Sequence, residues 1–406
     1  MTGGLLKTTS GLAIAAAAGI FALGTTPVLA ADYGGDCCAD LEERVAELEA
    51  TTARHSNRNI SLTIYGWVNQ AILFWNDGGE SDAYIVGNDN AGTRLGVKGE
   101  GKVTSDVSVG YKLELAFLND PIGDGAGIDQ GTFHGGDDSG FVSRVRQEYV
   151  YISSASLGKL TLGQQGSPLY DTNGGVDLGG GTTWSAYDYP QGHAYYFHIR
   201  RGDGTLTGTH WAGLLSSFGP SRDELIRYDT PDFAGFHLAA AWGEDDVWSL
   251  GAWYNGEFAG TQVALGVANR AVTEDDAGGT DTQVISIAGS IYNAPSGLFG
   301  TVEYDIAQTD AVGVNDATNI YAKLGWRKNV NGLGETALYG EWDQTENNGR
   351  DAQMWGLGVT QDLDAVGATM YLHYRHHEVT AGEAVICGAT GCEALDTVLG
   401  GMVVTF

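Results

Sequence analysis

Few residue patterns in this sequence could perform chemistry. His373, His376 and His377 lie close together, but the two-residue repeat of a strand would place His376 on the opposite face from the other two. That separation disfavours a shared metal site. Glu341 and Asp343 would share one strand face, and they fit the wall of a polar interior better than a general acid and base. Because the sequence also lacks a Gly-x-Ser-x-Gly elbow, a Walker motif and a His-Glu-x-x-His motif, we predict that the chain is not an enzyme.

Acidic runs supply oxygen ligands of the type that calcium prefers. The runs at 136–139 and 274–276 could bind calcium weakly, but they lack the ligand spacing of a dedicated calcium loop, and such runs are more often solvated surface. We expect no cofactor and no metal site beyond this weak calcium binding. The formal net charge of −30 would repel nucleic acid, so we exclude DNA and RNA as partners.

The N-terminal region is typical of an exported protein. A positively charged start, a short apolar run and small residues around Ala30 predict a signal peptide over residues 1–30. Residues 31–59 would then be a periplasmic segment. Within this segment, Leu41, Val45, Leu48 and Thr52 follow one another at spacings of 4, 3 and 4 residues. This pattern predicts a short helix, which is either an oligomerising coiled coil or a solvated amphipathic helix.

Four cysteines follow the predicted signal peptide. Cys387 and Cys392 enclose a short loop, and exported proteins favour disulfides, so we predict a bond between these two residues. The adjacent residues Cys37 and Cys38 are poorly placed to bond to each other. They could bridge neighbouring chains or stay reduced, and the sequence does not decide between these alternatives.

From residue 60 onward, apolar and polar residues alternate with a period of two. In one example, Leu113, Leu115 and Phe117 alternate with Lys112 and Glu114, as in a strand with one apolar and one polar face. About sixteen such segments, most of about 9 to 13 residues, have the length of tilted transmembrane strands. They start near residues 60, 91, 106, 142, 157, 222, 234, 247, 261, 282, 298, 319, 334, 352, 368 and 394. Short turns alternate with long loops rich in Gly and Asp, which is the pattern of outer-membrane barrels.

These features predict an all-β fold, a transmembrane antiparallel β-barrel of about 16 strands over residues 60–406. A soluble β-sandwich would usually have shorter strands, and a propeller would show a fixed repeat that this sequence lacks. The last segment ends on the aromatic residue Phe406, on its apolar face. Together with the signal peptide, this residue indicates recognition by the barrel-assembly machinery.

Three stretches resemble the general bacterial porins of Gram-negative outer membranes, of the alphaproteobacterial type. They are Thr93–Glu100, Ser156–Gln164 and Ile226–Phe236, and they occur in the family's order ahead of Phe406. The resemblance implies a homotrimer in outer-membrane lipid and lipopolysaccharide, in which each protomer forms its own water-filled channel with an infolded constriction loop. It implies passive diffusion of ions and small hydrophilic solutes as the function.

In that family the third loop carries acids opposite a cluster of arginines. The resemblance places the loop at 166–190, with Asp171 and Asp177 as its acids, and with Gly181 where relatives have a further acid. Strand alternation places several bases on lumen faces, because an arginine facing lipid would cost about 2–4 kcal/mol at the membrane midplane. The predicted pore-lining bases are Arg94, Lys98, Arg144, Arg146 and Arg227. Opposed acids and arginines would create a transverse field that orients dipolar solutes and tunes ion selectivity.

Two finer expectations follow from the same alternation and from the composition. On the segment that begins near residue 142, we place Arg144, Arg146 and Glu148 on the lumen face, opposite Val145 and Tyr149. The excess of acids over the whole chain favours a mild preference for cations, although charges more than about 8–10 Å from the narrowing are screened.

A substrate-specific channel for sugars or peptides is the main alternative function. Such channels often line their path with aromatic side chains, and aromatic residues cluster in or after the third loop. They are Trp184, Tyr187, Tyr189, Tyr195, Tyr196 and Phe197. An adhesin is a third alternative. The sequence pattern does not predict the conformation of residues 182–220.

Overall fold

The computed structural model describes residues 60–118, 130, 142–172, 175–184, 186, 194, 197–215, 218, 222–243, 246–273 and 280–406. The predicted signal peptide, the N-terminal helix, Cys37 and Cys38 lie outside these residues, as do the acidic runs at 136–139 and 274–276. What the sequence indicates for these segments therefore stays a prediction. Within the described ranges, no helix is long and apolar enough to cross a membrane.

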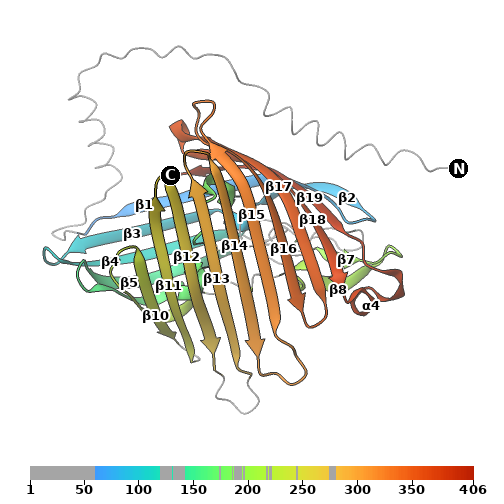
Figure 1. Ribbon diagram of the computed structural model, residues 1–406, viewed down its shortest axis with the longest axis horizontal. Helices are drawn as coiled ribbons and strands as arrows, with labels where there is room; N and C mark the ends of the chain where they lie inside the picture. The colour runs from blue at the N-terminus through green and yellow to red at the C-terminus, as the bar shows by residue number, and fades with distance from the viewer. Residues whose placement is uncertain are drawn as a thin grey trace. The chain divides into compact units, whose positions relative to one another are not determined.

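One large antiparallel sheet forms most of the described chain (Figure 1). Its strands are β1 (Thr63–Asn76), β2 (Ser81–Gly87), β3 (Arg94–Lys102), β4 (Val107–Leu118), β5 (Val142–Ser154), β6 (Gly158–Gly166), β9 (Arg222–Asp229), β10 (Phe236–Gly243), β11 (Val247–Phe258), β12 (Thr261–Val272), β13 (Thr282–Asn293), β14 (Leu298–Thr309), β15 (Ala317–Lys328), β16 (Thr336–Asn347), β17 (Asp351–Leu363), β18 (Ala368–Ala381) and β19 (Leu395–Thr405). Each strand pairs with its neighbours in chain order, and β19 pairs with β1. The sheet is therefore closed into a barrel.

The described part of the sheet has seventeen strands, but β2 and β3 lie end to end beside β1 and share one position. The barrel therefore has sixteen strand positions. Both β2 and β3 pair with β1: Gln70–Asn76 pairs with β2, and Thr63–Trp67 pairs with β3. The short 3₁₀ turn η1 (Asp89–Ala91) separates the two halves. The prediction of a sixteen-stranded antiparallel barrel is confirmed.

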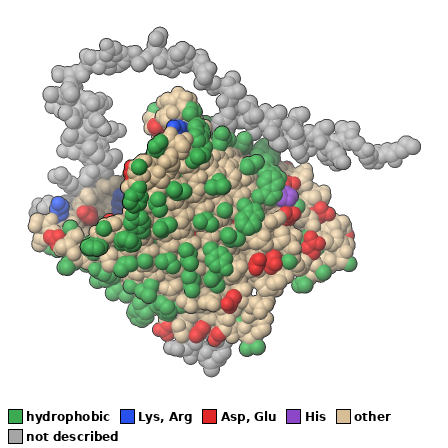
Figure 2. All heavy atoms as spheres, viewed as in Figure 1, with side chains coloured by type: hydrophobic (Ala, Val, Ile, Leu, Met, Phe, Trp, Pro, Cys, Tyr) green, Lys and Arg blue, Asp and Glu red, His purple; other side chains and the backbone are tan. Residues whose placement is uncertain are grey.

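The outer face of the barrel is apolar and its inner face is polar. Outward residues such as Leu250, Leu265 and Ile287 are about half exposed, whereas their inward neighbours Ser249 and Ser286 are fully buried. Figure 2 shows hydrophobic side chains spread over the outer surface of the strands at the front of the view. A soluble sheet would bury its apolar face, so this arrangement suits a barrel surrounded by lipid.

β5 contains a β-bulge at Arg146. Glu114 and Leu115 are consecutive residues of β4, but their partners Gln147 and Val145 are separated by one residue. Arg146 is that extra residue, so two residues of β5 lie opposite one position of β4. The Arg146 side chain nevertheless contacts Glu114 in the lumen, with its Nε 3.2 Å from Glu114 Oε1.

The bulge reverses the alternation along the rest of β5. Tyr149 pairs with the lumen residue Lys112 and faces the lumen, whereas Glu148 pairs with Leu113 on the outer face. The predicted faces of Glu148 and Tyr149 are therefore wrong, because the prediction assumed an uninterrupted period of two. Arg144 pairs with the buried Ala116, and this register keeps Arg144 on the lumen side.

The long connection between β6 and β9 is here called loop 3 (residues 167–221), and its described residues pack against the inner face of the barrel wall. Its short elements are α3 (Pro168–Thr172), η2 (Gly180–Trp184), the hairpin β7 (His198–Arg200) and β8 (Leu206–His210), and η3 (Trp211–Gly213). Around the hairpin, Phe197, Ile199 and Trp211 form an apolar core with Leu73 of β1 and Leu399 of β19. Residues 182–220, for which the sequence pattern predicted no conformation, thus include a part that packs against the inner wall.

Two other loops hold the hairpin in place. The Arg200 guanidinium lies 2.8 Å from the carboxylate of Asp77, in the loop after β1. Arg201 forms a backbone bridge with Cys392, in the loop that also contains α4 (Glu383–Ile386) and η5 (Gly388–Thr390). Cys387 and Cys392 are joined by a disulfide, as predicted. These contacts fasten loop 3 to the rim that carries the long loops.

The position of the apolar face relative to the membrane can be tested with arginine substitutions. Ile287→Arg, near the middle of β13, should destabilise the barrel by about 2–4 kcal/mol, because the guanidinium would lie near the membrane midplane. Ile291→Arg lies on the same face near the turn end of β13 and should cost about 0–1 kcal/mol. Urea-induced unfolding from lipid bilayers compares the two variants. Equal losses would show that depth in the membrane does not distinguish these positions.

Candidate channel constriction

Loop 3 follows the inner wall of one side of the barrel. Leu169 and Val176 pack against Trp253 and against the small residues Ala264 and Ala268. The Trp253 indole nitrogen donates a hydrogen bond of 3.0 Å to Thr172 Oγ1, at the end of α3. Farther along, η2 packs against β16, β17 and β18. Loop 3 therefore covers the lumen wall from about β10 to β18.

The end of η2 also contacts the opposite side of the seam between β19 and β1. The Asn88 side-chain amide donates a 2.8 Å hydrogen bond to the Trp184 carbonyl. The Trp184 ring meets the Trp67 ring edge-on, with 5.4 Å between ring centres. Trp67 in turn lies beneath the Arg94 guanidinium, whose central carbon is 4.6 Å from the ring centre. Loop 3 is thereby linked to one of the predicted pore-lining arginines.

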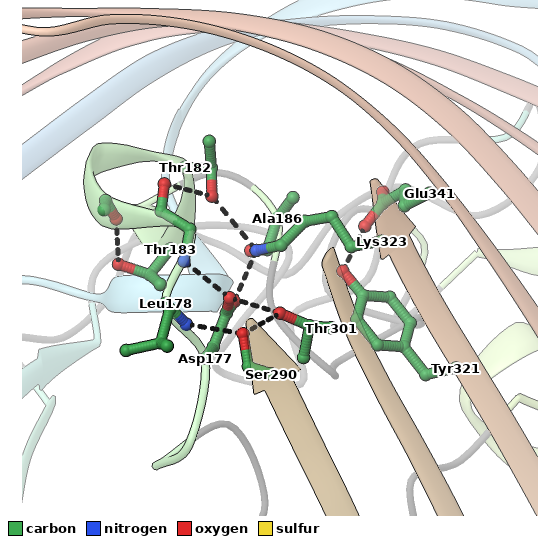
Figure 3. A network of polar contacts seen from close by, with 12 residues as sticks. Asp177, Leu178, Thr182, Thr183, Ala186, Ser290, Thr301, Tyr321, Lys323 and Glu341 are labelled. Carbon is green, nitrogen blue, oxygen red and sulfur yellow. Dashed lines mark hydrogen bonds and ion pairs between the residues drawn. The ribbon is translucent and has the colours of Figure 1, made fainter. Parts of the chain in front are cut away.

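Asp177 fastens the middle of loop 3 to the wall through an ion pair with Lys323 of β15 (Figure 3). The other Asp177 oxygen accepts hydrogen bonds of 2.8 Å from Thr301 and from the Gly179 backbone N–H. Both charged side chains are buried: Lys323 is 0% exposed and Asp177 is 2% exposed. The Asp177 carboxylate therefore turns toward the wall and not toward the channel, in contrast to the placement that the resemblance implied.

The Lys323 ammonium has an acceptor for each of its three N–H groups. Besides Asp177, it donates to Thr182 Oγ1 at 3.0 Å and to the Ala186 carbonyl at 2.9 Å. A buried charge is tolerated only when it is paired and hydrogen-bonded, and this site satisfies both conditions. The contacts bring residues on both sides of η2 against one lysine, so this cluster determines where loop 3 lies.

A second buried network lies beside the first (Figure 3). Glu341 accepts hydrogen bonds from Arg375 Nε at 2.7 Å and from the Tyr321 hydroxyl at 2.8 Å, and His373 Nε2 lies 2.8 Å from it. The Glu341, Arg375 and His373 side chains are all 0% exposed. This side of the lumen is therefore closed, and the acid at 341 is a paired structural group and not a solvent-facing acid or base.

The opposite wall, on β3 to β6 and β9, carries the arginine cluster. The carboxylate of Glu114 lies 3.8 Å from Arg94 Nη1 and 3.2 Å from Arg146 Nε. Tyr170 of loop 3 meets the same cluster, since its hydroxyl accepts hydrogen bonds from Arg222 at 2.6 Å and from Arg146 at 3.5 Å. Three guanidinium groups thus lie between the barrel wall and the start of loop 3. Arg222 was absent from the sequence-based set.

Arg227 connects β9 to α3. Its Nη2 lies 2.6 Å from Asp171 Oδ2 and 2.6 Å from Asp229 Oδ1, and its Nη1 donates to the Gly166 carbonyl at 3.0 Å. The Asp171 side chain is still 44% exposed. The loop acids that the sequence predicted are therefore each in direct ion pairs, and not arranged as a separate ring facing the arginines across open water.

The remaining two predicted bases also lie on the lumen side. Lys98 is exposed there, with its ammonium nitrogen 5.4 Å from the centre of the Tyr65 ring. Arg144 is exposed near the loop end of β5, and within the described part of the chain no acid lies within ion-pair distance of it. Their role as pore-lining residues stays a prediction.

Two adjoining cavities lie along the wall that the described part of loop 3 leaves uncovered. Their volumes are about 400 Å³ and 240 Å³, and they share Lys112, Tyr149 and Lys159 as lining residues. The smaller cavity also contacts Asp171 and Arg227, and thus reaches α3. The larger one extends toward the short-turn rim of the barrel.

Several charged residues of the site were missed from the sequence. They are Lys112, Glu114, Lys159, Arg222 and Lys323. Strand alternation could have found most of them: Lys112 and Glu114 flank Leu113, as Arg94 flanks Leu95. No group of three metal-ligating side chains occurs among the residues that the structure describes.

Comparison with known proteins agrees with this architecture. The chitoporin of Vibrio furnissii is 24% identical over 193 residues, which are 47% of this chain and 42% of that protein. This chain thus spans less than half the length of that relative. The anion-selective porin from Comamonas acidovorans superposes with a TM-score of 0.59 at 20% identity, covering 86% of this chain and 100% of that one. The trimer form of OmpT from Vibrio cholerae gives a TM-score of 0.55 at 16% identity, covering 86% and 99%.

The two solved structures share the barrel fold with this chain. Because their sequence identities are low, the fold is all that is inferred from them. The family comparison carries more, because it matches nearly the whole chain. The family described as "Gram-negative porin" matches residues 12–382. The closed barrel, its apolar outer face and this match place the protein in the bacterial outer membrane, and the chain belongs to the Gram-negative porin family.

Proposed function

We propose that this chain forms a passive channel for ions and small hydrophilic solutes, narrowed by loop 3 at Arg94, Arg146, Arg222 and Tyr170. The observation that carries the proposal is the uncovered, charged wall inside a barrel whose outer face is apolar. Diffusion through such a passage needs no bond-making group, so we propose no catalytic residue and no cofactor. Charged groups at the narrowing would instead bias which solutes pass.

A substrate-specific sugar channel is the second candidate, suggested by the similarity to a chitoporin. The aromatic residues that the sequence suggested as the lining of a sugar path give this candidate little support. Phe197 is buried in the apolar core of loop 3, and Trp184 packs against Trp67. The tyrosines at 187, 189, 195 and 196 lie outside the described residues. A general diffusion channel is therefore the better-supported proposal.

We also propose that three copies assemble, as the resemblance implied. One solved structure of similar fold, OmpT of Vibrio cholerae, is described in a trimer form. A closed barrel satisfies all its strand pairing within one chain, so association would need only side-chain contacts between outer faces. Contact with lipopolysaccharide and with the assembly machinery remains an expectation from the resemblance.

Single-channel recording in a planar lipid bilayer tests the proposed function. We expect large steps of conductance that rise linearly with salt concentration, and no saturable block by chitooligosaccharides, because the passage would be filled with water. Saturable block by such a sugar would favour the specific channel instead. Absence of any conductance from the folded protein would refute both candidates.

The ion pair that fastens loop 3 can be tested in the same recordings. Asp177→Asn leaves the buried Lys323 ammonium without its counter-charge, which costs about 3–5 kcal/mol for a buried pair. We expect loop 3 to detach locally, so that the current becomes larger and noisier. The ratio of anion to cation permeability should change little, because the Asp177 carboxylate is turned away from the channel.

The double variant Asp177→Asn with Lys323→Met is the control for this experiment. It removes both charges, and replacement of a whole buried pair by apolar groups is often neutral. A quiet current close to that of the unmodified protein is therefore expected. If Asp177→Asn alone already gives such a current, then this ion pair does not hold loop 3.

A further inference from the structure

The uncovered wall brings three lysines together in one cavity. Lys98 of β3 and Lys112 of β4 are direct cross-strand partners on the lumen face. Lys159 of β6 lines the same cavity of about 400 Å³. Like charges directly opposite each other destabilise a strand pair, so the fold gains nothing from the pairing of Lys98 with Lys112. A group that destabilises the fold is a candidate for function.

The acids around these lysines do not balance them. Lys112 lies 3.6 Å from Glu114, but that carboxylate also serves Arg94 and Arg146. Within the described part of the chain, neither Lys98 nor Lys159 has a carboxylate within ion-pair distance. Glu100 is the one described acid that lines the larger cavity. The cavity therefore carries an excess of positive charge.

Tyr149 and Tyr151 line the same cavity, and the Tyr65 ring lies beside two of its lysines. The Lys98 and Lys112 ammonium nitrogens lie 5.4 Å and 5.5 Å from the centre of the Tyr65 ring, and Lys159 lies 5.1 Å from that of Tyr151. Two of the hydroxyls are already engaged, since Tyr65 donates to Glu114 and Tyr151 donates to Glu100. Tyr149 makes no hydrogen bond from its hydroxyl to another described residue, which leaves this O–H as a donor toward the cavity.

We propose that Lys98, Lys112, Lys159 and Tyr149 form a binding subsite for small organic anions, either carboxylates or phosphate esters. The two facing ammonium groups and the Tyr149 hydroxyl would hold the anionic oxygens. The Tyr149 and Tyr151 rings, which line the cavity, would cover the rest of the solute. The volume suits a small molecule. The inference rests on the proposed channel function and adds a preferred solute class, since an anion leaving the arginine cluster enters this cavity next.

The subsite predicts an anion preference, opposite to the preference expected from the net charge of −30. The reversal potential under a potassium chloride gradient should show chloride as the more permeant ion. Phenyl phosphate should block the current saturably and more strongly than inorganic phosphate, because its ring would contact Tyr149 and Tyr151. Glucose, which is uncharged, should not block. Recordings at low ionic strength avoid screening of the lysines.

Charge-removing variants locate the site. Lys98→Gln should weaken phenyl phosphate block about fivefold, and Lys98→Gln with Lys112→Gln should weaken it about twenty-fivefold, as expected for a charge contact of a few ångströms in water. Lys328→Gln is the matched control: Lys328 ends β15 and donates to the Pro295 carbonyl, away from the cavity. This control should leave block and reversal potential unchanged.

The outcomes separate the two proposals. A conducting pore that prefers potassium, or one whose block is equally sensitive to Lys98→Gln and Lys328→Gln, overturns the subsite and leaves the channel standing. No conductance overturns both. Thermal unfolding gives a second readout, because Lys98→Gln relieves a like-charge pair and should unfold at no lower temperature than the unmodified protein. A clear drop would show that Lys98 serves stability, and would overturn its assignment to binding.

Discussion

Lipid offers no hydrogen-bond partners, so each strand of a membrane-embedded sheet needs a neighbour on both sides. The pairing of β19 with β1 supplies the last missing neighbours and closes the barrel. Once the barrel is closed, alternate residues of every strand must enter the lumen. Closure therefore determines where charge can be placed, and the positions of bases and acids inside the barrel follow from it.

The two sides of the lumen differ in how far their charged side chains are buried and paired. On the side of β13 to β18, Lys323 and Glu341 are fully enclosed and each is saturated by partners from the wall or from loop 3. Removing one partner would leave a buried charge uncompensated, so these contacts resist displacement. The apolar core around Trp211 fastens the hairpin of loop 3 to β1 and to β17, β18 and β19. Among the described residues, the wall that loop 3 leaves open to solutes is that of β3 to β6 and β9.

The sequence was sufficient for the barrel, because a strict period of two and alternating connector lengths are properties of local sequence. The same period placed Arg94 and Lys98 on the lumen side. It failed on β5, where one extra residue at Arg146 reverses the faces of Glu148 and Tyr149. No residue type in this stretch is characteristic of a β-bulge, so the sequence did not predict it. It could not find the partner of Asp177 either, because Lys323 is 146 residues away and their meeting depends on the path of loop 3.

The net charge of the chain is negative, whereas the charge on the uncovered wall is positive. The chain has 51 acids and 21 Lys and Arg residues, which give the net charge of −30, but a charge acts over only about 8–10 Å at physiological ionic strength. Acids in the loops can influence a solute as it approaches, whereas a solute inside the barrel responds to the wall beside it. On the uncovered wall, Lys98 faces Lys112 and the Glu114 carboxylate is shared among several bases. Which solutes the wall favours would then depend on strand alternation and on which wall loop 3 covers, and the total charge of the chain does not report either of these.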